Sequence, residues 1–539
     1  MKKIYTVLLC VVSASLFAQN PHWEWISGVE TAYSNPDHVL SVDAQGNVYT
    51  LSTFTADIIN DNYQFYNANP DANDSFFTKF NAAGQFQWAV HITGAGGNSL
   101  WDMEADADGN VYLLGSHTNG MEIAGQQYSG LGTFIAKFDT TGAMLWLKTA
   151  SFSFPNSLKV DENGNIYFQV TSRNAFSFDG TAFTMVNQAS DNQYLAKLDT
   201  NGNVIWHKTY YGTDDYRYYN SLQQLQVDHL GNLLLTGTTN QSTITFDNIT
   251  LNNTYSGAFY FVKINAEGAT QWGTLTGNNA CSNSASDIAV DADNNIYLMG
   301  NYCGTVNFGS TQLTVSPSGS RYFISKYSPS GENIWVKSSL SGPVSEVQSG
   351  DFDAQGNLII GGTIFGTATF GANVTLTSSE TEGAQFVVLY NAEGNAQWGI
   401  TTGPININNA IDVKAYGDHT IYTGAHMSSP SLAYGNINYI KQGDNFGNIT
   451  LGKLVYDDVA GTPTVNAKQV IVYPNPVSKT LNITTTEAVK EIAITDFNGR
   501  IVLSTANTNS INMELLASGI YFATVTTDRG KSTHKIVKE

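Results

Sequence analysis

The densest group of side chains suited to binding a ligand lies in a tyrosine-rich segment at residues 210–220. Tyrosine rings offer faces for stacking and hydroxyls for hydrogen bonds. Nearby carboxylates and one guanidinium add charged partners, so the set suits a sugar or a peptide. The candidate ligand-binding residues are Tyr210, Tyr211, Asp214, Asp215, Tyr216, Arg217, Tyr218 and Tyr219. The alternative is that these tyrosines pack over a long loop and on neighbouring elements.

An acidic run at residues 101–110 raises the question of calcium. An EF-hand loop that began at Glu104 would need an acidic residue at its twelfth position. Gly115 occupies that position, so the plainer interpretation is a turn with extra carboxylates. Glu104 and Asp108 remain weak calcium candidates, and no other cofactor is predicted.

No common catalytic motif stands out in the sequence. It has no His-Glu-x-x-His, no Gly-x-Ser-x-Gly and no Walker loop, and its nine histidines are scattered along the chain. We therefore name no catalytic residue, and the sequence favours a protein without enzymatic activity but leaves the question undecided. Activity assembled from residues that meet only in space stays open.

Two cysteines, Cys281 and Cys303, lie outside the N-terminal apolar segment. They flank an expected hairpin whose turn centres near residue 293, which places them close to register. An oxidising compartment favours a disulfide between them, with two free thiols or a two-cysteine metal site as alternatives. In each case we expect a structural staple rather than a redox centre.

The elements that must position these residues follow a repeat marked by seven tryptophans. The steps between them are 63, 58, 60, 66, 63 and 63 residues, and a fixed period of this length indicates one recurring supersecondary unit. We expect these tryptophans to dock one unit on the next: Trp25, Trp88, Trp146, Trp206, Trp272, Trp335 and Trp398.

Each unit reads as two β-hairpins. In residues 134–146 an apolar strand with a lysine leads through an Asp-Thr-Thr-Gly turn to the tryptophan strand, which is type I turn chemistry. A second turn, Asp-Ala-Asp-Gly-Asn at residues 106–110, precedes an almost continuously apolar strand. Such a run indicates a strand that is covered on both faces. Four strands repeated radially predict the blades of a β-propeller.

The two ends of the repeat set the expected number of blades. The Trp25 strand has no hairpin partner before it, and the partner-like strand at residues 451–457 has no tryptophan after it. Pairing these two strands completes a seventh blade, with residues 22–28 as its outer edge, and closes the ring. The sequence thus predicts an all-β, seven-bladed β-propeller over residues 19–458.

The repeat resembles the seven-bladed propeller repeat of secreted bacterial proteins. The shared sequence pattern is Lys-x-Asp-x-x-Gly-x-x-x-Trp followed by Asp-x-x-Gly-Asn-x-Tyr. The similarity covers about residues 22–457. Its Gly-x-x-x-Trp part is also similar to the tryptophan-docking motif of quinoprotein dehydrogenases. This resemblance implies a fold rather than an activity, because propellers host many unrelated functions.

Composition and charge indicate an exported protein. Charged residues make up 13% and the net charge is −20, which argues against nucleic-acid binding. Lys2, Lys3 and the apolar residues 4–17 predict a signal peptide over residues 1–18, and Cys10 lies too deep in it to suit lipidation. No other segment reads as a transmembrane helix.

The C-terminal region loses the repeat and reads as a separate domain. After a linker at residues 459–469, short strands in residues 470–539 suggest a small Ig-like β-sandwich. This domain is similar to the type A C-terminal sorting domain of the type IX secretion system of Gram-negative bacteria. The resemblance rests on a basic C-terminus and on Tyr473, Pro474, Asn475, Pro476, Gly499, Gly519 and Tyr521. It implies outer-membrane passage and recognition by the translocon and its sorting peptidase.

These patterns support three functional hypotheses. The leading one is an extracellular or surface-attached binding protein whose ligand is a glycan or a protein. The alternative is an extracellular propeller enzyme, such as a polysaccharide lyase, a glycosidase or a quinone-dependent dehydrogenase. Paired carboxylates facing the channel would favour the glycosidase. A structural surface-layer role is the third hypothesis.

Overall fold

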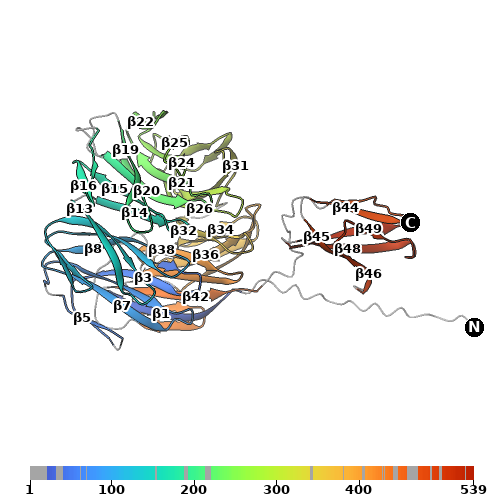
Figure 1. Cartoon of the computed structure of the whole chain (residues 1–539), viewed down its shortest axis with the longest axis horizontal. Coiled ribbons are helices and arrows are strands. Elements are labelled where there is room, and N and C mark those ends of the chain that lie inside the picture. Colours follow the sequence, from blue (N-terminus) through green and yellow to red (C-terminus); the bar gives the residue numbers. More distant parts are fainter. Residues whose placement is uncertain are drawn as a thin grey trace, which may run out of the picture. The chain divides into compact units, whose positions relative to one another are not determined.

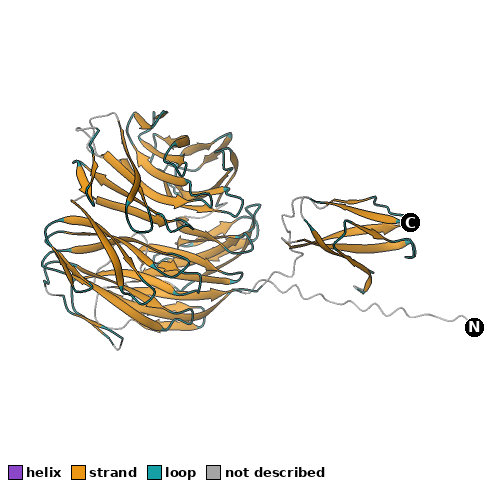
Figure 2. Cartoon of the chain, viewed as in Figure 1, coloured by secondary structure: helices purple, strands orange, loops and turns teal. Residues whose placement is uncertain are grey.

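The computed structural model divides the chain into two compact units, Gln19–Asp458 and a unit that includes Val459–Glu539. The expected signal peptide and linker lie outside the described residues. Those residues are 21–31, 40–60, 62–67, 69–151, 154–186, 192–212, 220–317, 319–339, 344–379, 381–403, 407–427, 429, 431–440, 447–457, 471–485, 488–496, 500–527 and 530–539. Within them the chain is all-β, as the sequence predicts, and Figure 2 shows strands joined by loops and turns.

The described part of the first unit contains seven antiparallel sheets built on four main strands each, and three of them gain two further strands from a short hairpin. The sheets are named here in the order of their innermost strands. The first three are β2 (Leu40–Val42), β3 (Val48–Phe54), β6 (Asp74–Phe80) and β7 (Phe86–Thr93); β8 (Asn98–Ala105), β9 (Val111–His117), β12 (Gly132–Phe138) and β13 (Met144–Ser151); and β14 (Phe154–Val160), β15 (Ile166–Ser172), β18 (Asn192–Leu198) and β19 (Val204–Gly212).

The fourth to sixth sheets repeat this order from the innermost to the outermost strand. They are β20 (Asn220–Val227), β21 (Leu233–Thr239), β24 (Gly257–Ile264) and β25 (Thr270–Asn278); β26 (Ser284–Val290), β27 (Ile296–Tyr302), β30 (Arg321–Tyr327) and β31 (Asn333–Ser338); and β32 (Val344–Phe352), β33 (Leu358–Ile364), β36 (Ala384–Tyr390) and β37 (Ala396–Thr401).

The seventh sheet joins the two ends of the unit. It holds β38 (Ile407–Tyr416), β39 (Thr420–Met427), β42 (Gly447–Val455) and, as its outermost strand, β1 (His22–Thr31). β1 and β42 are antiparallel, in a register that runs from His22 opposite Val455 to Thr31 opposite Gly447. The N-terminal strand thus completes the last sheet.

The innermost strands close the sheets into a ring. Each of β2, β8, β14, β20, β26 and β32 packs against the innermost strand of the next sheet, and β38 packs against β2 (Figure 1). This radial arrangement is propeller-like, and it leaves no sheet at the end of the row.

Hydrophobic cores lie between neighbouring sheets. In one of them Tyr112 and Ile135 of the second sheet meet Phe168 and Tyr194 of the third, and all four are at most 1% exposed. The central strands are therefore covered on both faces, which explains their unbroken apolar sequences.

A third hairpin in each repeat is absent from the sequence-based prediction, which has only two. The structure inserts a short hairpin between the second and third strands of every sheet in the ring. The inserted pairs are β4 (Ile58–Ile59) and β5 (Gln64–Phe65), β10 (Met121–Ile123) and β11 (Gln126–Tyr128), β16 (Phe176–Phe178) and β17 (Thr181–Phe183), β22 (Thr243–Phe246) and β23 (Ile249–Asn252), β28 (Thr305–Phe308) and β29 (Thr311–Thr314), β34 (Thr367–Phe370) and β35 (Val374–Thr377), and β40 (Ser431–Tyr434) and β41 (Ile437–Ile440). In three repeats the hairpin hydrogen-bonds to the outermost strand of the preceding sheet, which covers that open edge.

The described residues of the second unit form two antiparallel sheets around their own core. One consists of β43 (Ile471–Tyr473), β44 (Thr480–Thr484) and β47 (Ser510–Asn512). The other consists of β46 (Ile501–Ala506), β45 (Val489–Thr495), β48 (Gly519–Thr527) and β49 (Gly530–Lys538). Val477, Ile492 and Ile536 are fully buried between them.

Candidate functional site

The recurring aspartates are bonded inside their own turns. Asp106 accepts hydrogen bonds from the backbone N–H groups of Asp108 and Asn110, from Asn110 Nδ2 at 2.8 Å and from the Tyr112 hydroxyl at 3.2 Å. Asp43, Asp161, Asp228, Asp291 and Asp353 follow the same pattern of backbone and Asn contacts. These carboxylates shape turns, so they are not free to bind a ligand.

Lysines on the third strands of the first, fourth and fifth sheets approach these turns. Lys79 Nζ lies 4.0 Å from Asp43 Oδ2, and Lys326 Nζ lies 3.3 Å from Asp291 Oδ2. Lys263 Nζ lies 2.8 Å from Asp228 Oδ2, with 7% and 0% of the two side chains exposed. Burial alone would raise the pKa of Asp228, but Lys263 and Asn232 hold it below its usual value. This pair is part of the scaffold.

The tryptophans dock each sheet on the next, and five indole N–H groups donate to a backbone carbonyl there. The pairs are Trp25 to Ala82 (3.3 Å), Trp88 to Thr140 (3.1 Å), Trp146 to Thr200 (3.2 Å), Trp206 to Ala266 (3.0 Å) and Trp272 to Pro329 (3.2 Å). Each acceptor belongs to a turn whose glycine faces the indole. At Gly268, with φ +87°, an added Cβ would lie 3.1 Å from the ring of Trp206.

The two remaining tryptophans differ from these five. Trp335 lies against Gly394 of the next turn, where an added Cβ would be 2.9 Å from its ring. Trp398 is buried, with 6% exposed, and its ring centroid lies 5.2 Å from that of Tyr456. All seven tryptophans thus face packing partners, and the repeat itself offers no ladder of exposed aromatic rings.

The structure divides the tyrosine-rich segment. Tyr210 is 3% exposed and packs in the core with Phe246, with ring centroids 4.9 Å apart, so it is not available to a ligand. Burial raises the pKa of its hydroxyl. Tyr211 is half-buried on β19. Asp214, Asp215, Tyr216, Arg217, Tyr218 and Tyr219 lie outside the described residues, between β19 and β20.

The weak calcium candidates do not come together. Glu104 pairs with Lys159 Nζ at 2.9 Å, which neutralises its charge, while Asp108 lies in an exposed turn. Among the described residues no group of three or more His, Cys, Asp or Glu side chains is arranged to hold a metal ion. A calcium site therefore finds no support in this geometry.

The ring centre gathers charges that the sequence-based prediction did not connect. Glu104, Lys159, Asp351 and Lys414 stand two residues before the first turn of the second, third, sixth and seventh sheets. Lys414 interacts electrostatically with Asp351, Glu104 and Asp287, which lie on other sheets. Burial lowers the pKa of Lys159, but the charges of Glu104 and Asp102 outweigh burial and raise that pKa. For the Asp351 carboxyl, burial raises the pKa although the charge of Lys414 acts to lower it.

Carboxylates at the ring centre also bind the backbone of the next innermost strand. Asp102 Oδ2 accepts from Leu158 N at 2.8 Å, Asp287 Oδ2 from Gly350 N at 2.8 Å and Asp412 Oδ2 from Leu40 N at 3.1 Å. Asp351 Oδ2 accepts from Ala415 N at 2.9 Å. These contacts satisfy N–H groups on inner edges that have no further strand to pair with. The carboxylates therefore hold neighbouring sheets together.

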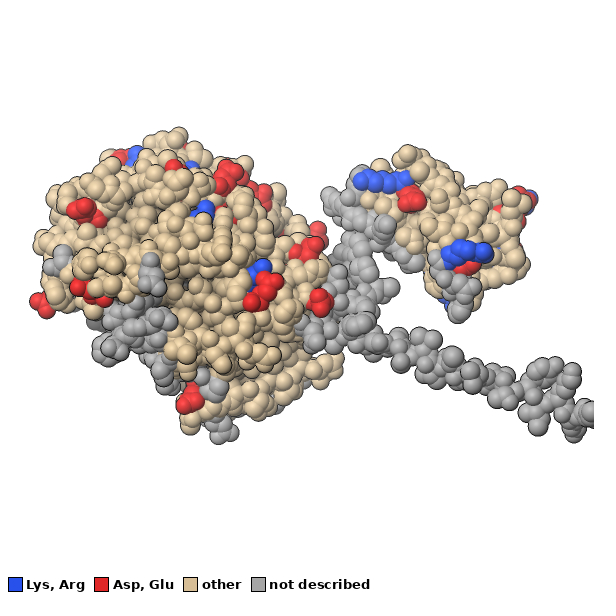
Figure 3. Space-filling model, turned by 90° about the horizontal axis from the view of Figure 1, so that it is seen from below, with Lys and Arg blue, Asp and Glu red and all other residues tan. Residues whose placement is uncertain are grey.

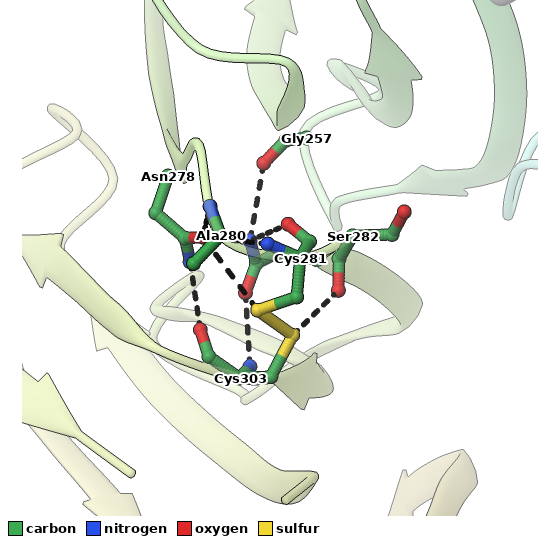
Figure 4. Close-up of a disulfide and its surroundings, with 7 residues drawn as sticks. Gly257, Asn278, Ala280, Cys281, Ser282 and Cys303 are labelled. Atoms are coloured by element: carbon green, nitrogen blue, oxygen red, sulfur yellow. Dashed lines mark hydrogen bonds between the residues drawn. A yellow bond between two sulfur atoms is a disulfide. The ribbon is translucent and has the colours of Figure 1, made fainter. Parts of the chain in front are cut away.

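A disulfide joins Cys281 to Cys303 and fixes the connection between the fourth and fifth sheets (Figure 4). Asn278 Nδ2 donates to Cys303 O at 2.7 Å, and Cys303 N donates to Asn283 Oδ1 at 3.0 Å. Asn283 Nδ2 donates in turn to the Gly257 and Cys281 carbonyls. This network is structural.

In the second unit the motif residues tie the first strand region to the last strand. Asn475 Nδ2 donates to Lys535 O at 2.8 Å, and Val537 N donates to Asn475 Oδ1 at 2.9 Å. Tyr473 is 49% exposed, and the Tyr521 hydroxyl donates to Ala517 O at 3.0 Å. Gly519 begins β48, Pro474 and Pro476 follow cis peptide bonds, and Gly499 lies outside the described residues.

On the face shown in Figure 3, the acidic side chains of the first unit lie in several separate places. No helix among the described residues is long and apolar enough to cross a membrane.

Residues 471–539 match the family described as the secretion system C-terminal sorting domain. This match confirms the resemblance found in the sequence. The domain directs export through the type IX secretion system to the cell surface or the extracellular space, and it interacts with the secretion machinery.

The chain is also 24% identical over 468 residues to an uncharacterized WD repeat-containing protein of Acanthamoeba polyphaga mimivirus. The alignment covers 76% of this chain but only 31% of the relative's length. This similarity agrees with the repeats seen in the sequence and suggests no activity for the chain.

Solved structures to which the chain is similar include a fungal alcohol oxidase of the AA5 family in complex with copper. It is 10% identical, with a TM-score of 0.37, over 96% of this chain and 99% of that one. The NanB sialidase of Streptococcus pneumoniae is 9% identical, with a TM-score of 0.35, over 81% and 70%. The exotype rhamnogalacturonan lyase YesX is 11% identical, with a TM-score of 0.26, over 79% and 90%. All three scores lie below 0.5, so none bears on activity.

Proposed function

We propose that the exported chain is a binding or interaction protein, in which a rigid closed ring presents connecting segments to a glycan or protein ligand. One observation carries the proposal: the polar residues that recur along the repeats are bonded to their own or the neighbouring sheet. Asp106, Lys263 and Trp206 illustrate the three kinds of contact. Recognition must then come from residues outside the repeat, as is usual for loops on a rigid scaffold.

The ring centre supports a scaffold better than it supports catalysis. A glycosidase needs one carboxyl group that donates a proton and a second that acts as a base or nucleophile. Here Asp102, Asp287 and Asp351 accept backbone N–H groups of the next sheet, and Glu104 pairs with Lys159. Among the described residues, no contact at the ring centre specifically favours the enzyme hypothesis.

The binding segment in this proposal is the tyrosine-rich connection at residues 213–219. It joins the outermost strand of the third sheet, β19, to the innermost strand of the fourth, β20. It is therefore one of the connections that run from the rim of one sheet to the centre of the next. Its sequence supplies rings and carboxylates suited to a sugar or a peptide. The partner that separates the sorting domain from this cargo would be the sorting peptidase of the same secretion system.

The test is a binding screen on residues 19–539 against a glycan array and a panel of extracellular proteins. Tyr216→Ala and Tyr218→Ala are expected to weaken the binding found in the screen by tenfold or more, about the loss expected for one stacked ring. Tyr66→Ala, which removes a tyrosine that is 59% exposed on another part of the ring, should leave binding unchanged. If nothing binds, or if all three variants bind like the parent, the proposal is wrong.

A further inference from the structure

The contact between the sixth and seventh sheets is built differently from the others. Elsewhere a tryptophan docks on the turn between the third and fourth strands of the next sheet, as Trp272 does on the turn that contains Pro329. The seventh sheet has no such turn, because its third strand, β42, and its fourth strand, β1, come from opposite ends of the unit. We call this contact the closing seam and the tryptophan-docked contacts the docked seams.

The tryptophan at the closing seam has no equivalent of the turn carbonyl. Trp398 is 6% exposed, and its Nε1 has no hydrogen-bond acceptor among the described residues. A buried N–H donor without an acceptor lowers the free energy of unfolding. The seam therefore lacks the hydrogen bond that five of the docked seams possess.

Tyr456, the residue directly after β42, occupies this place. Its ring lies 5.2 Å from that of Trp398 and 5.4 Å from that of His419, measured between centroids. Its hydroxyl lies 2.6 Å from Asp353 Oδ2 in the sixth sheet and 2.9 Å from the Asp418 carbonyl in the seventh. Its backbone N–H donates to the His419 carbonyl at 3.2 Å. One residue thus touches both sides of the seam.

The same pair of hydroxyl contacts occurs at two docked seams, where a strand tyrosine makes it. The Tyr49 hydroxyl contacts Asp43 Oδ2 at 2.9 Å and the Gly109 carbonyl of the next sheet at 3.1 Å. Tyr167 does the same with Asp161 at 3.2 Å and the Gly231 carbonyl at 3.1 Å. In the sixth sheet the corresponding position holds Ile359, which has no hydroxyl. Tyr456 supplies the missing group from the far end of the unit.

We infer that Tyr456 is the closing latch of the ring, and that the closing seam opens first when this latch is lost. The ring then requires an intact chain at both ends, from β1 to Tyr456. Tyr456 lies two residues before the end of the first unit at Asp458. Any processing that releases the first unit from the sorting domain must therefore leave Tyr456 in place.

Hydrogen exchange on the full exported chain tests this inference. Tyr456→Phe removes only the hydroxyl and should speed exchange in β38, β39, β42 and β1 by about tenfold, with little change in β14 to β25. Tyr49→Phe is the matched control, because it removes the same two contacts at a seam that Trp88 still holds. Its local exchange should change less than threefold.

Equal effects of the two substitutions, or faster exchange spread evenly over the ring, would overturn the inference. Tyr456→Ala should enlarge the effect at the same four strands. The intact mass of the protein released by the secreting cell gives an independent readout, and we expect its C-terminus at or beyond Tyr456. A stable released propeller that ends before Tyr456 would also contradict the latch.

Discussion

The docked seams and the closing seam meet the same physical requirement with different residues. At the seam between the third and fourth sheets, Trp206 donates to Ala266 O at 3.0 Å across a turn. At the closing seam the seventh sheet has no turn between its third and fourth strands, and Tyr456 bridges Asp353 and Asp418 instead. The difference shows that the repeated residues serve the contacts between sheets. Where the repeat is interrupted because its two ends meet, a residue outside the pattern makes these contacts instead. The periodic residues therefore define the fold, and residues that recognise a ligand are expected outside the repeat.

The lysine pairs give the largest expected contrast between a docked sheet, the fourth, and the seventh sheet, which closes the ring. Lys263 pairs with the buried Asp228 at 2.8 Å, whereas Lys453 of β42 pairs with Glu24 of β1, which is 48% exposed, at 2.7 Å. Asp228→Asn should lower the free energy of unfolding by about 4 kcal/mol, because it leaves a buried ammonium without its partner. Glu24→Gln should cost less than about 1 kcal/mol. Urea unfolding of both variants checks this, and equal losses would contradict the contrast.

The pH dependence of stability sharpens the same comparison. The pKa of Asp228 is held below its value in the unfolded chain, which is about 3.9. Its contribution is therefore present above about pH 4 and is lost as the pH falls through the folded-state pKa. Unfolding free energies measured from pH 6 to pH 2 should fall less steeply in Asp228→Asn than in the parent. Parallel curves would show that this carboxylate does not contribute.

The disulfide adds a covalent constraint next to one docked seam. Replacing Cys281 and Cys303 with serine removes a cross-link between residues 22 positions apart. The free energy of unfolding should fall by about 3 kcal/mol, mainly because the unfolded chain gains freedom. Urea unfolding of the double variant, compared with the parent under non-reducing conditions, measures this loss. A loss that disappears when both proteins are reduced assigns it to the cross-link, and an unchanged midpoint would refute it.

The smallest contrast concerns the indole N–H groups. Trp206→Phe removes a hydrogen bond, whereas Trp398→Phe removes a buried donor that has no acceptor among the described residues. Beyond the packing loss common to both, Trp206→Phe should cost about 1 kcal/mol more. Matched thermal or urea unfolding curves provide the comparison, and the opposite order would contradict it.

Much of the fold follows from the sequence because it is encoded locally. The Asp-x-x-Gly-Asn turns, the apolar strands and the pairing of residues 22–28 with residues 451–457 all depend on short patterns that the structure reproduces. The third hairpin also has a local signal that two-hairpin reasoning missed. Phe178-Asp-Gly and Phe246-Asp-Asn place a residue with positive φ, Asp179 or Asp247, in a tight turn.

The ring centre and the closing latch could not be read in the same way. Glu104 meets Lys159 from a strand 55 residues away, and Tyr456 meets Asp353 across 103 residues. Glu104, Lys159 and Tyr456 occupy positions whose residue type changes from one repeat to the next, so neither period nor spacing marks them. Only the closure of the ring brings them together. Tyr210 shows the converse, because its neighbours in sequence suggested a ligand site and the core holds it instead.

Closure of the ring by its two ends is the central claim, and a cysteine pair tests it most directly. His22 and Val455 are opposite residues on β1 and β42, so His22→Cys with Val455→Cys should form a disulfide in the folded exported chain. Peptide mapping without reduction should then find residue 22 linked to residue 455, beside the Cys281–Cys303 link. Finding the native link but no link between 22 and 455 in the folded protein would contradict the account.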